Sequence, residues 1–137
     1  MADVQSLVGG CLCGAVRYRC GAPIHAPAYC HCTSCRRAAG AHAVAWFTVE
    51  ADSLVFTQGQ PAVYLSSPPV HRTFCGRCGT PLTYRHASSP SEVDITIGSL
   101  DEPGRVAPTA HIWMEDAATW DRPADGLPSH PRTRRDG

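Results

Sequence analysis

Short apolar or alternating stretches separated by turn residues recur along the whole chain. In residues 7–20 two candidate strands flank the turn-prone Gly14, and in the second strand Val16 and Tyr18 alternate with arginines. Turn-forming runs of Gly, Pro, Ser and Gln separate the later stretches. We expect these later strands at residues 43–49, 53–57, 62–65, 70–74, 81–85 and 93–97, with a possible last one at 110–114. The pattern predicts a mostly β fold.

Only one segment favours a helix, and the end of the chain favours neither helix nor strand. Residues 33–39 can form one or two helical turns, which Thr33 or Ser34 would cap and Gly40 would end. From Asp121 onward the chain is rich in Pro, Arg and Asp, which predicts an extended or frayed segment. We therefore expect one domain over residues 1–128 and a flexible C-terminal tail over residues 129–137.

Composition and charge narrow the classes of protein that fit. The 137 residues correspond to one domain, and 12 basic residues balance 12 acidic ones, so binding to nucleic acid through bulk charge is not expected. No apolar stretch is long enough for a membrane helix, and the first residues do not resemble a signal peptide. The sequence predicts a cytoplasmic protein without membrane contact and leaves its oligomeric state open. In a reducing compartment, clustered cysteines favour metal binding over disulfides.

Two of the three cysteine clusters can together complete one metal site. Cys11 and Cys13 form a C-x-C pair, which on a strand places both side chains on one face. Cys75 and Cys78 form a C-x-x-C pair flanked by glycines that let the backbone wrap around an ion. Structural zinc takes four ligands in tetrahedral geometry, so the two pairs predict one closed site.

The third cluster supplies only three thiols. Cys30, Cys32 and Cys35 lie within six residues, and three protein ligands leave a fourth position free, as in catalytic zinc sites. His31 can fill that position, but on an extended segment its side chain should point away from its two neighbours. The competing interpretation of all seven cysteines is a set of buried free thiols, and their spacing favours metal. Cys20 stands alone and is expected to be a small apolar core residue.

The three clusters lie in motifs that resemble a known family. The motifs are GCLCGAV at residues 10–16, CHCTSCRR at 30–37 and FCGRCGTPL at 74–82. They resemble the glutathione-dependent formaldehyde-activating enzymes, also called the centromere protein V family. DITIGSLD at 94–101, HIW at 111–113, Trp120 and DGLP at 125–128 are similar to its C-terminal half.

This resemblance implies a β-tent fold with antiparallel sheets and two zinc ions. One ion is implied at Cys11, Cys13, Cys75 and Cys78, and a second ion, with catalytic character, at Cys30, Cys32 and Cys35. The implied reaction joins the thiol of glutathione to formaldehyde, and the class is carbon–sulfur lyase. The expected partners are therefore a small thiol and a small aldehyde, and the expected cofactor is zinc. The alternative is a non-catalytic, zinc-stabilised binding module, which a fourth protein ligand on the second ion would favour.

The sequence offers several candidates for residues that line a substrate pocket. The candidates are Trp46, Phe47, His71, Arg72, His111 and Trp113. Aromatic residues on strands usually pack in a core, so core packing is the competing interpretation for each of them. Arg72 or Arg36 could hold a substrate carboxylate through two parallel hydrogen bonds.

Overall fold

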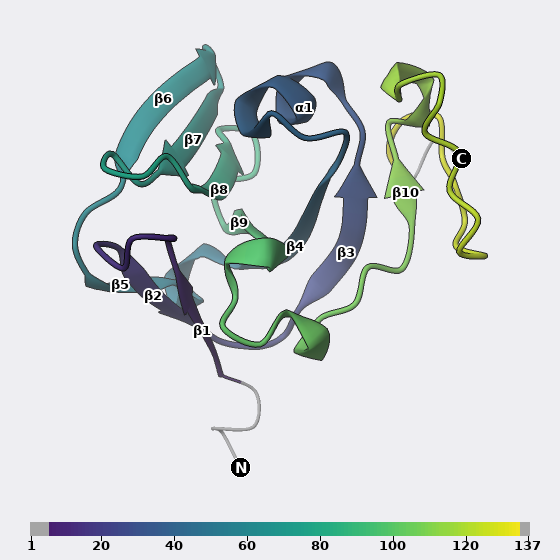
Figure 1. Ribbon diagram of the computed structural model, residues 1–137. Coiled ribbons are helices and arrows are strands. Elements are labelled where there is room, and N and C mark those ends of the chain that lie inside the picture. The colour runs from purple at the N-terminus through teal and green to yellow at the C-terminus, as the bar shows by residue number, and fades with distance from the viewer. Residues whose placement is uncertain (1–5, 135–137) are drawn as a thin grey trace.

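The computed structural model describes residues 6–134, and strands dominate them (Figure 1). The strands and the single α-helix are β1 (Leu7–Gly10), β2 (Arg17–Cys20), β3 (His25–Cys30), α1 (Thr33–Ala39), β4 (Val44–Glu50), β5 (Val55–Gln58), β6 (Ala62–Ser67), β7 (Val70–Phe74), β8 (Pro81–His86), β9 (Glu92–Thr96) and β10 (His111–Ile112). Short 3-10 turns cover Ala51–Ser53, Ile97–Ser99, Pro103–Arg105 and Met114–Asp116. No helix in residues 6–134 has the length and apolar character that crossing a membrane requires.

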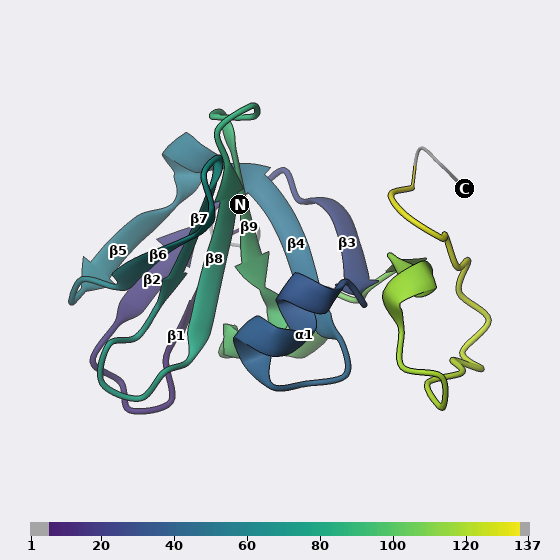
Figure 2. The same cartoon turned by 90° about the horizontal axis from the view of Figure 1, so that it is seen from above.

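The strands form two sheets. The smaller has the order β1-β2-β5, and the larger has the order β10-β3-β4-β9-β8-β7-β6. All neighbours pair in antiparallel fashion except β10, which pairs in parallel with β3. Seen from above, the larger sheet runs from β3 to β6 with α1 lying beside β4 (Figure 2). The mostly β, β-tent arrangement expected from the sequence is confirmed.

Strand β4 separates the hydrophobic core from a second, smaller apolar cluster. Its residues Phe47 and Val49 are fully buried in the main core, which includes Tyr18 of the smaller sheet. Side chains alternate along a strand, so Val44 and Trp46 point to the opposite face. There they pack with Cys30 and Cys35. The alternation of β4 therefore gives the larger sheet one core face and one face toward the three-cysteine cluster.

The helix agrees with the sequence except for its cap. It covers Thr33–Ala39, and Gly40 ends it with a φ of 63°, in the left-handed region that glycine adopts without strain. The expected cap at Thr33 or Ser34 is wrong. The N-cap is Cys32, whose sulfur accepts a hydrogen bond from the backbone N–H of Cys35.

Strand β3 was absent from the sequence-based expectations. Its residues HAPAYC contain a proline and two alanines, which are depleted in strands, and they show no clean apolar alternation. A register shift interrupts its pairing with β4 between His25 and Ala28. Such an irregular strand forms because its neighbours on both sides supply partners. It ends at Cys30 and so positions the three-cysteine cluster.

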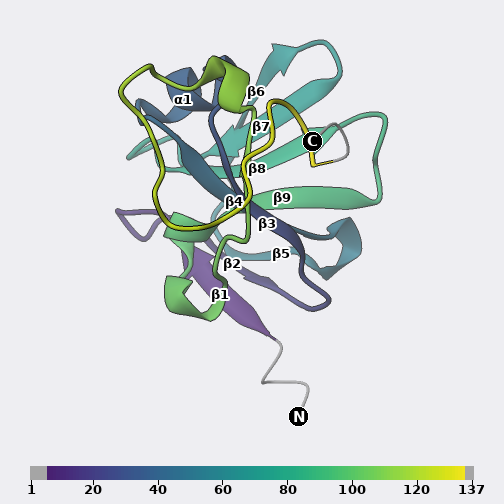
Figure 3. The ribbon, with the colours of Figure 1, turned by 90° about the vertical axis from the view of Figure 1, so that its right-hand side faces the viewer.

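The C-terminal segment is extended and joined to the domain. Backbone hydrogen bonds link residues 128–132 to residues 111–115, and His111 forms a parallel bridge with Ser129. Figure 3 shows this segment, in yellow, running beside the segment that carries β10. The described part of the expected flexible tail is therefore hydrogen-bonded to β10 and its surroundings; residues 135–137 lie outside the described range.

Candidate metal centres and cavity

The structure brings Cys11, Cys13, Cys75 and Cys78 together although up to 67 positions separate them. Their four sulfur atoms lie within 4.8 Å of one another, and two of the sulfur pairs, Cys11–Cys13 and Cys13–Cys75, are 3.7 Å apart. Four sulfurs at about 2.3 Å from a tetrahedral zinc ion would lie about 3.8 Å from each other. The spacing of the thiols therefore fits a closed four-ligand metal site.

Backbone groups around these four cysteines also fit a bound metal. The N–H of Val16 donates to the sulfur of Cys11 at 3.2 Å. The N–H groups of Arg77 and Cys78 donate to the sulfur of Cys75 at 3.3 and 3.4 Å. Hydrogen bonds from backbone amides favour thiolates over thiols and orient them toward an ion. The expected strand placement of Cys11 and Cys13 is wrong, because β1 ends at Gly10 and both cysteines lie in the loop that follows it. The cluster joins this loop between β1 and β2 to the loop between β7 and β8.

Cys30, Cys32 and Cys35 form the second cluster at the junction of β3 and α1. Their sulfur atoms also lie within 4.8 Å of one another. Cys30 is the last residue of β3, Cys32 caps the helix, and Cys35 lies in its first turn, three residues later and on the same side. The two clusters could each hold a metal ion.

The three thiols of this second cluster perturb one another. Hydrogen bonds with Cys30, the larger effect, and with Cys35 lower the pKa of Cys32 to about 2. In turn, the hydrogen bond with Cys32 is the largest of the effects that raise the pKa of Cys30. One thiol thus ionises at the expense of its neighbour, because closely spaced anions repel each other. A divalent cation would remove this conflict, so the chemistry of the donors fits a metal ion here as well.

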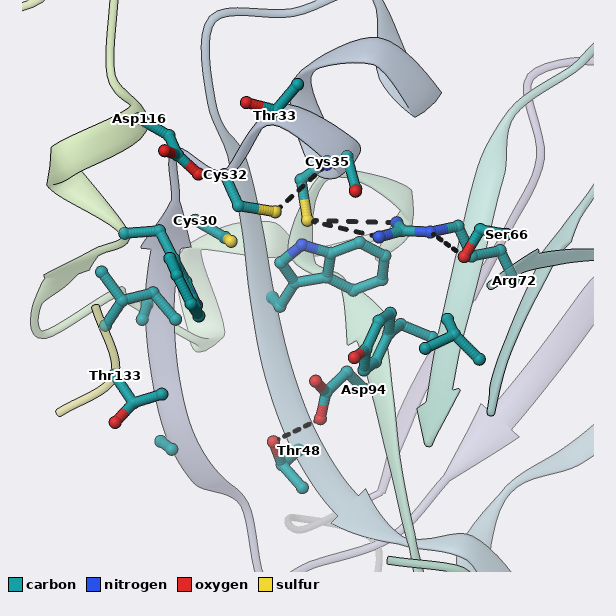
Figure 4. A pocket seen from close by; sticks show the side chains of 18 of the residues that line it. Cys30, Cys32, Thr33, Cys35, Thr48, Ser66, Arg72, Asp94, Asp116 and Thr133 are labelled. Carbon is teal, nitrogen blue, oxygen red and sulfur yellow. Dashed lines mark hydrogen bonds between the residues drawn. The ribbon is translucent and has the colours of Figure 1, made fainter. Parts of the chain in front are cut away.

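A cavity of about 760 Å³ opens beside the three-cysteine cluster (Figure 4). Cys30, Cys32 and Cys35 all line it. None of the cysteines of the first cluster lines it or the neighbouring cavity of about 740 Å³. The volume is in the range of small-molecule sites. Of the two clusters, the one with three ligands is thus the one that a small molecule can approach.

The opposite side of the cavity is a row of side chains across the larger sheet. Residues directly opposite each other in antiparallel strands share a face. The pairings Thr48–Asp94, Asp94–Tyr84 and Tyr84–Arg72 therefore place these four residues, from β4, β9, β8 and β7, on one face, and all four line the cavity. The row supplies a hydroxyl, a carboxyl, a phenol and a guanidinium.

Arg72 connects this row to the three-cysteine cluster. Both of its terminal nitrogens lie 3.9 Å from the sulfur of Cys35, and its Nε donates to the hydroxyl of Ser66 at 3.1 Å. The guanidinium carbon lies 5.0 Å from the centre of the Tyr84 ring, in a cation–π arrangement. A buried cation beside the thiols stabilises their ionised form.

His31 points away from the thiols, as strand alternation predicts. Its Nε2 lies 2.9 Å from Nδ1 of His111, and the Nε2 of His111 lies 2.8 Å from a carboxylate oxygen of Asp125. On the other side, Nδ1 of His31 lies 3.2 Å from Asp121, which also contacts His42 at 2.7 Å. His31 therefore joins the cysteine loop to the C-terminal segment.

The sequence-based pocket candidates divide into two groups. Trp46, Arg72 and Trp113 line the cavity. Phe47 is fully buried in the core, His71 is exposed on β7, and His111 is buried between His31 and Asp125. None of these three, nor Arg36, is among the residues lining either cavity.

Sequence reasoning missed Asp94 and Tyr84 as cavity residues. Asp94 stands between two apolar positions in a strand that was expected. The polar face of β9 could equally have faced solvent, so the strand pattern alone gives no signal. Only the register with β4 and β8 places both side chains opposite the cysteines.

Comparisons with known proteins agree with this geometry. A family model described as "Glutathione-dependent formaldehyde-activating enzyme" matches residues 6–116. A protein of Halomonas elongata, named "Putative glutathione-dependent formaldehyde-activating enzyme", is 30% identical over 123 residues, which cover 83% of this chain and 78% of that protein. A crystal structure of a Rhodobacter sphaeroides protein has a TM-score of 0.59 at 20% identity, covering 90% of this chain and 99% of the other, a likeness of fold.

Proposed function

The chain belongs to the glutathione-dependent formaldehyde-activating enzyme family, and from this premise we propose that it joins a small thiol to a small aldehyde such as formaldehyde. The observation that carries the proposal is the position of the three-cysteine cluster at the cavity, in contrast to the four-cysteine cluster. In the direction of synthesis, a carbon–sulfur bond forms and the proton of the thiol ends on the former carbonyl oxygen. The reverse reaction breaks that bond, as a carbon–sulfur lyase does.

We assign zinc as the cofactor of both clusters. Cys11, Cys13, Cys75 and Cys78 would hold a structural ion, and Cys30, Cys32 and Cys35 would hold a second ion with a position left for a ligand. Sulfur-only ligand sets favour zinc among divalent ions that do not change oxidation state. A bound zinc ion would supply a low pKa for the substrate thiol, because a coordinating thiol loses its proton.

Side chains around the cavity balance the charge of the thiolates and keep part of the cavity apolar. Three thiolates around a divalent ion carry a net charge of −1, and an added substrate thiolate makes it −2. Arg72 offsets part of it from 3.9 Å. Trp46 and Trp113 line the same cavity and keep part of its surface apolar, which strengthens electrostatic interactions within it.

The test measures metal content and adduct formation together. Wild-type protein should hold two zinc ions per chain and form the thiol–aldehyde adduct faster than buffer does. Cys30→Ser should hold one zinc ion and lose the rate enhancement, because two remaining thiolates hold zinc poorly. Cys20→Ser is the matched control, since Cys20 is a buried cysteine of β2 that belongs to neither cluster. Full activity of zinc-loaded Cys30→Ser, or no enhancement by the wild type with any thiol, would contradict the proposal.

A further inference from the structure

Asp94 is a carboxyl group in the cavity without a cation beside it. Its Oδ1 accepts a hydrogen bond of 2.6 Å from the hydroxyl of Thr48. Within residues 6–134 this is its one hydrogen bond from a side chain, and no arginine or histidine lies within ion-pair distance of it. Burial raises the pKa of Asp94 to about 6, so near neutral pH most molecules carry a poorly compensated negative charge.

A partly buried and poorly compensated carboxylate lowers the stability of the fold. The carboxylate lies on a face where Tyr84 and Trp46 surround the cavity, and an apolar residue or an amide would fit there without a buried charge. Perturbed carboxyls in cavities are typical of functional sites. A positively charged group on a ligand would compensate the charge of Asp94.

The distance from the cysteines argues against direct proton transfer to the aldehyde. Cys30 lies opposite Val44 on β4, whereas Asp94 lies opposite Thr48, four residues further along the same strand. Four residues of strand span about 13 Å along β4. Tyr84 also lies between Asp94 and Arg72, the residue of the same row that reaches the sulfur of Cys35. A proton donor must come within about 3 Å of the reacting oxygen, which is only two bonds from the sulfur in the adduct. Asp94 is thus placed to meet a remote part of a substrate whose sulfur lies at the cysteines.

We propose that Asp94 binds a primary ammonium group of the thiol substrate, so that the cavity selects thiols that carry an amine several bonds from sulfur. This inference rests on the proposed function, because it places the sulfur of the same ligand at the three-cysteine cluster. An ammonium group donates up to three hydrogen bonds and neutralises the carboxylate. Thr48 holds one carboxylate oxygen in place and leaves the other for the ligand.

Arg134 is a cation in the same cavity and would bind a carboxylate of the ligand that lies next to the ammonium group. It lines the cavity, and its guanidinium donates to the carbonyl of Pro27 on β3 and to the hydroxyl of Thr109. Pro27 precedes Ala28, which lies opposite Trp46, so this cation lies toward the part of the cavity away from Cys30. A ligand end with both charges, as in an α-amino acid, matches an anion and a cation on this side.

The experiment compares two thiols that differ in one amino group. Glutathione carries the ammonium group, and glutaryl-cysteinylglycine lacks only that group. Both are titrated by calorimetry into zinc-loaded wild type, Asp94→Asn and the control Asp52→Asn, which removes an exposed carboxylate outside the cavity. We expect Asp94→Asn to weaken glutathione about tenfold or more and to leave the analogue unchanged or bound more tightly. Asp52→Asn should bind both thiols as wild type does.

Other results separate the inference from the function on which it rests. If Asp94→Asn weakens both thiols equally, or neither, the ammonium assignment is wrong while the thiol site stands. If neither thiol binds the zinc-loaded wild type, or if Cys30→Ser binds both equally well, the proposed function fails and the inference with it. Asp94→Ser, tested in the same way, guards against a local effect of the asparagine amide.

Discussion

The two cysteine clusters use the same ligand atom in opposite surroundings. The first joins two loops, receives hydrogen bonds from backbone amides, and lines neither cavity. The second lies at a strand–helix junction, has the Arg72 guanidinium 3.9 Å from the sulfur of Cys35, and lines the larger cavity with all three of its cysteines. The number of thiols and the groups around them, rather than the donor atom, distinguish the enclosed cluster from the one that faces the cavity.

The largest expected effect comes from breaking the four-cysteine cluster. Cys75→Ser should abolish cooperative folding under conditions where wild type is folded, because structural zinc contributes roughly 10–16 kcal/mol of apparent binding energy to a folded state. Thermal unfolding and metal analysis measure the result. Cys30→Ser is the matched comparison and should unfold cooperatively with one zinc ion. Equal unfolding of both variants would show that the two clusters do not differ in structural role.

A chelator should remove the metal ions of the two clusters one after the other. The three-cysteine cluster has one ligand fewer and faces a cavity, so its metal should leave first. We expect adduct formation to stop after loss of one zinc ion per chain, while far-ultraviolet circular dichroism stays unchanged until the second ion leaves. Metal released is counted with a chromogenic chelator in the same samples. Simultaneous loss of activity and structure would contradict the distinction.

The sequence predicted this distinction only in part. The spacing of the cysteines predicted which thiols lie together, because residues two or three positions apart stay close in any compact turn. The expected reason was wrong for Cys11 and Cys13, which lie in the turn after β1 and not on a strand. The strand patterns likewise predicted most of the sheet. What lines the cavity depends on pairing between strands far apart in sequence: Asp94 meets Thr48 across 46 positions. Strand β3 was missed because Pro27 and an irregular register hide its pattern.

The cation beside the second cluster should affect ligand binding rather than metal content. Arg72→Gln removes a positive charge near the sulfur of Cys35, so a substrate thiolate would join a more negative site. A hydrogen-bonded charge of this kind corresponds to about 10- to 100-fold in the dissociation constant of the thiol. Zinc content should remain two per chain, since the thiolates are intact. Arg85→Gln, an exposed arginine on β8, is the control and should change neither quantity.

The smallest expected effect is a gain of stability on the cavity side. Because the pKa of Asp94 rises from 3.8 to about 6 in the fold, its destabilising contribution is absent below pH 3.8, grows as pH rises to 6, and stays constant above 6. Asp94→Asn should therefore raise the free energy of unfolding at pH 8 by on the order of 1–3 kcal/mol, and by less at pH 5. Urea unfolding of the zinc-loaded proteins at both values, with Asp52→Asn as control, measures this. A loss of stability at pH 8 would mean that the carboxylate supports the fold. A higher free energy of unfolding for Asp94→Asn would show that Asp94 lowers the stability of the fold, whereas the cysteines of the four-cysteine cluster raise it.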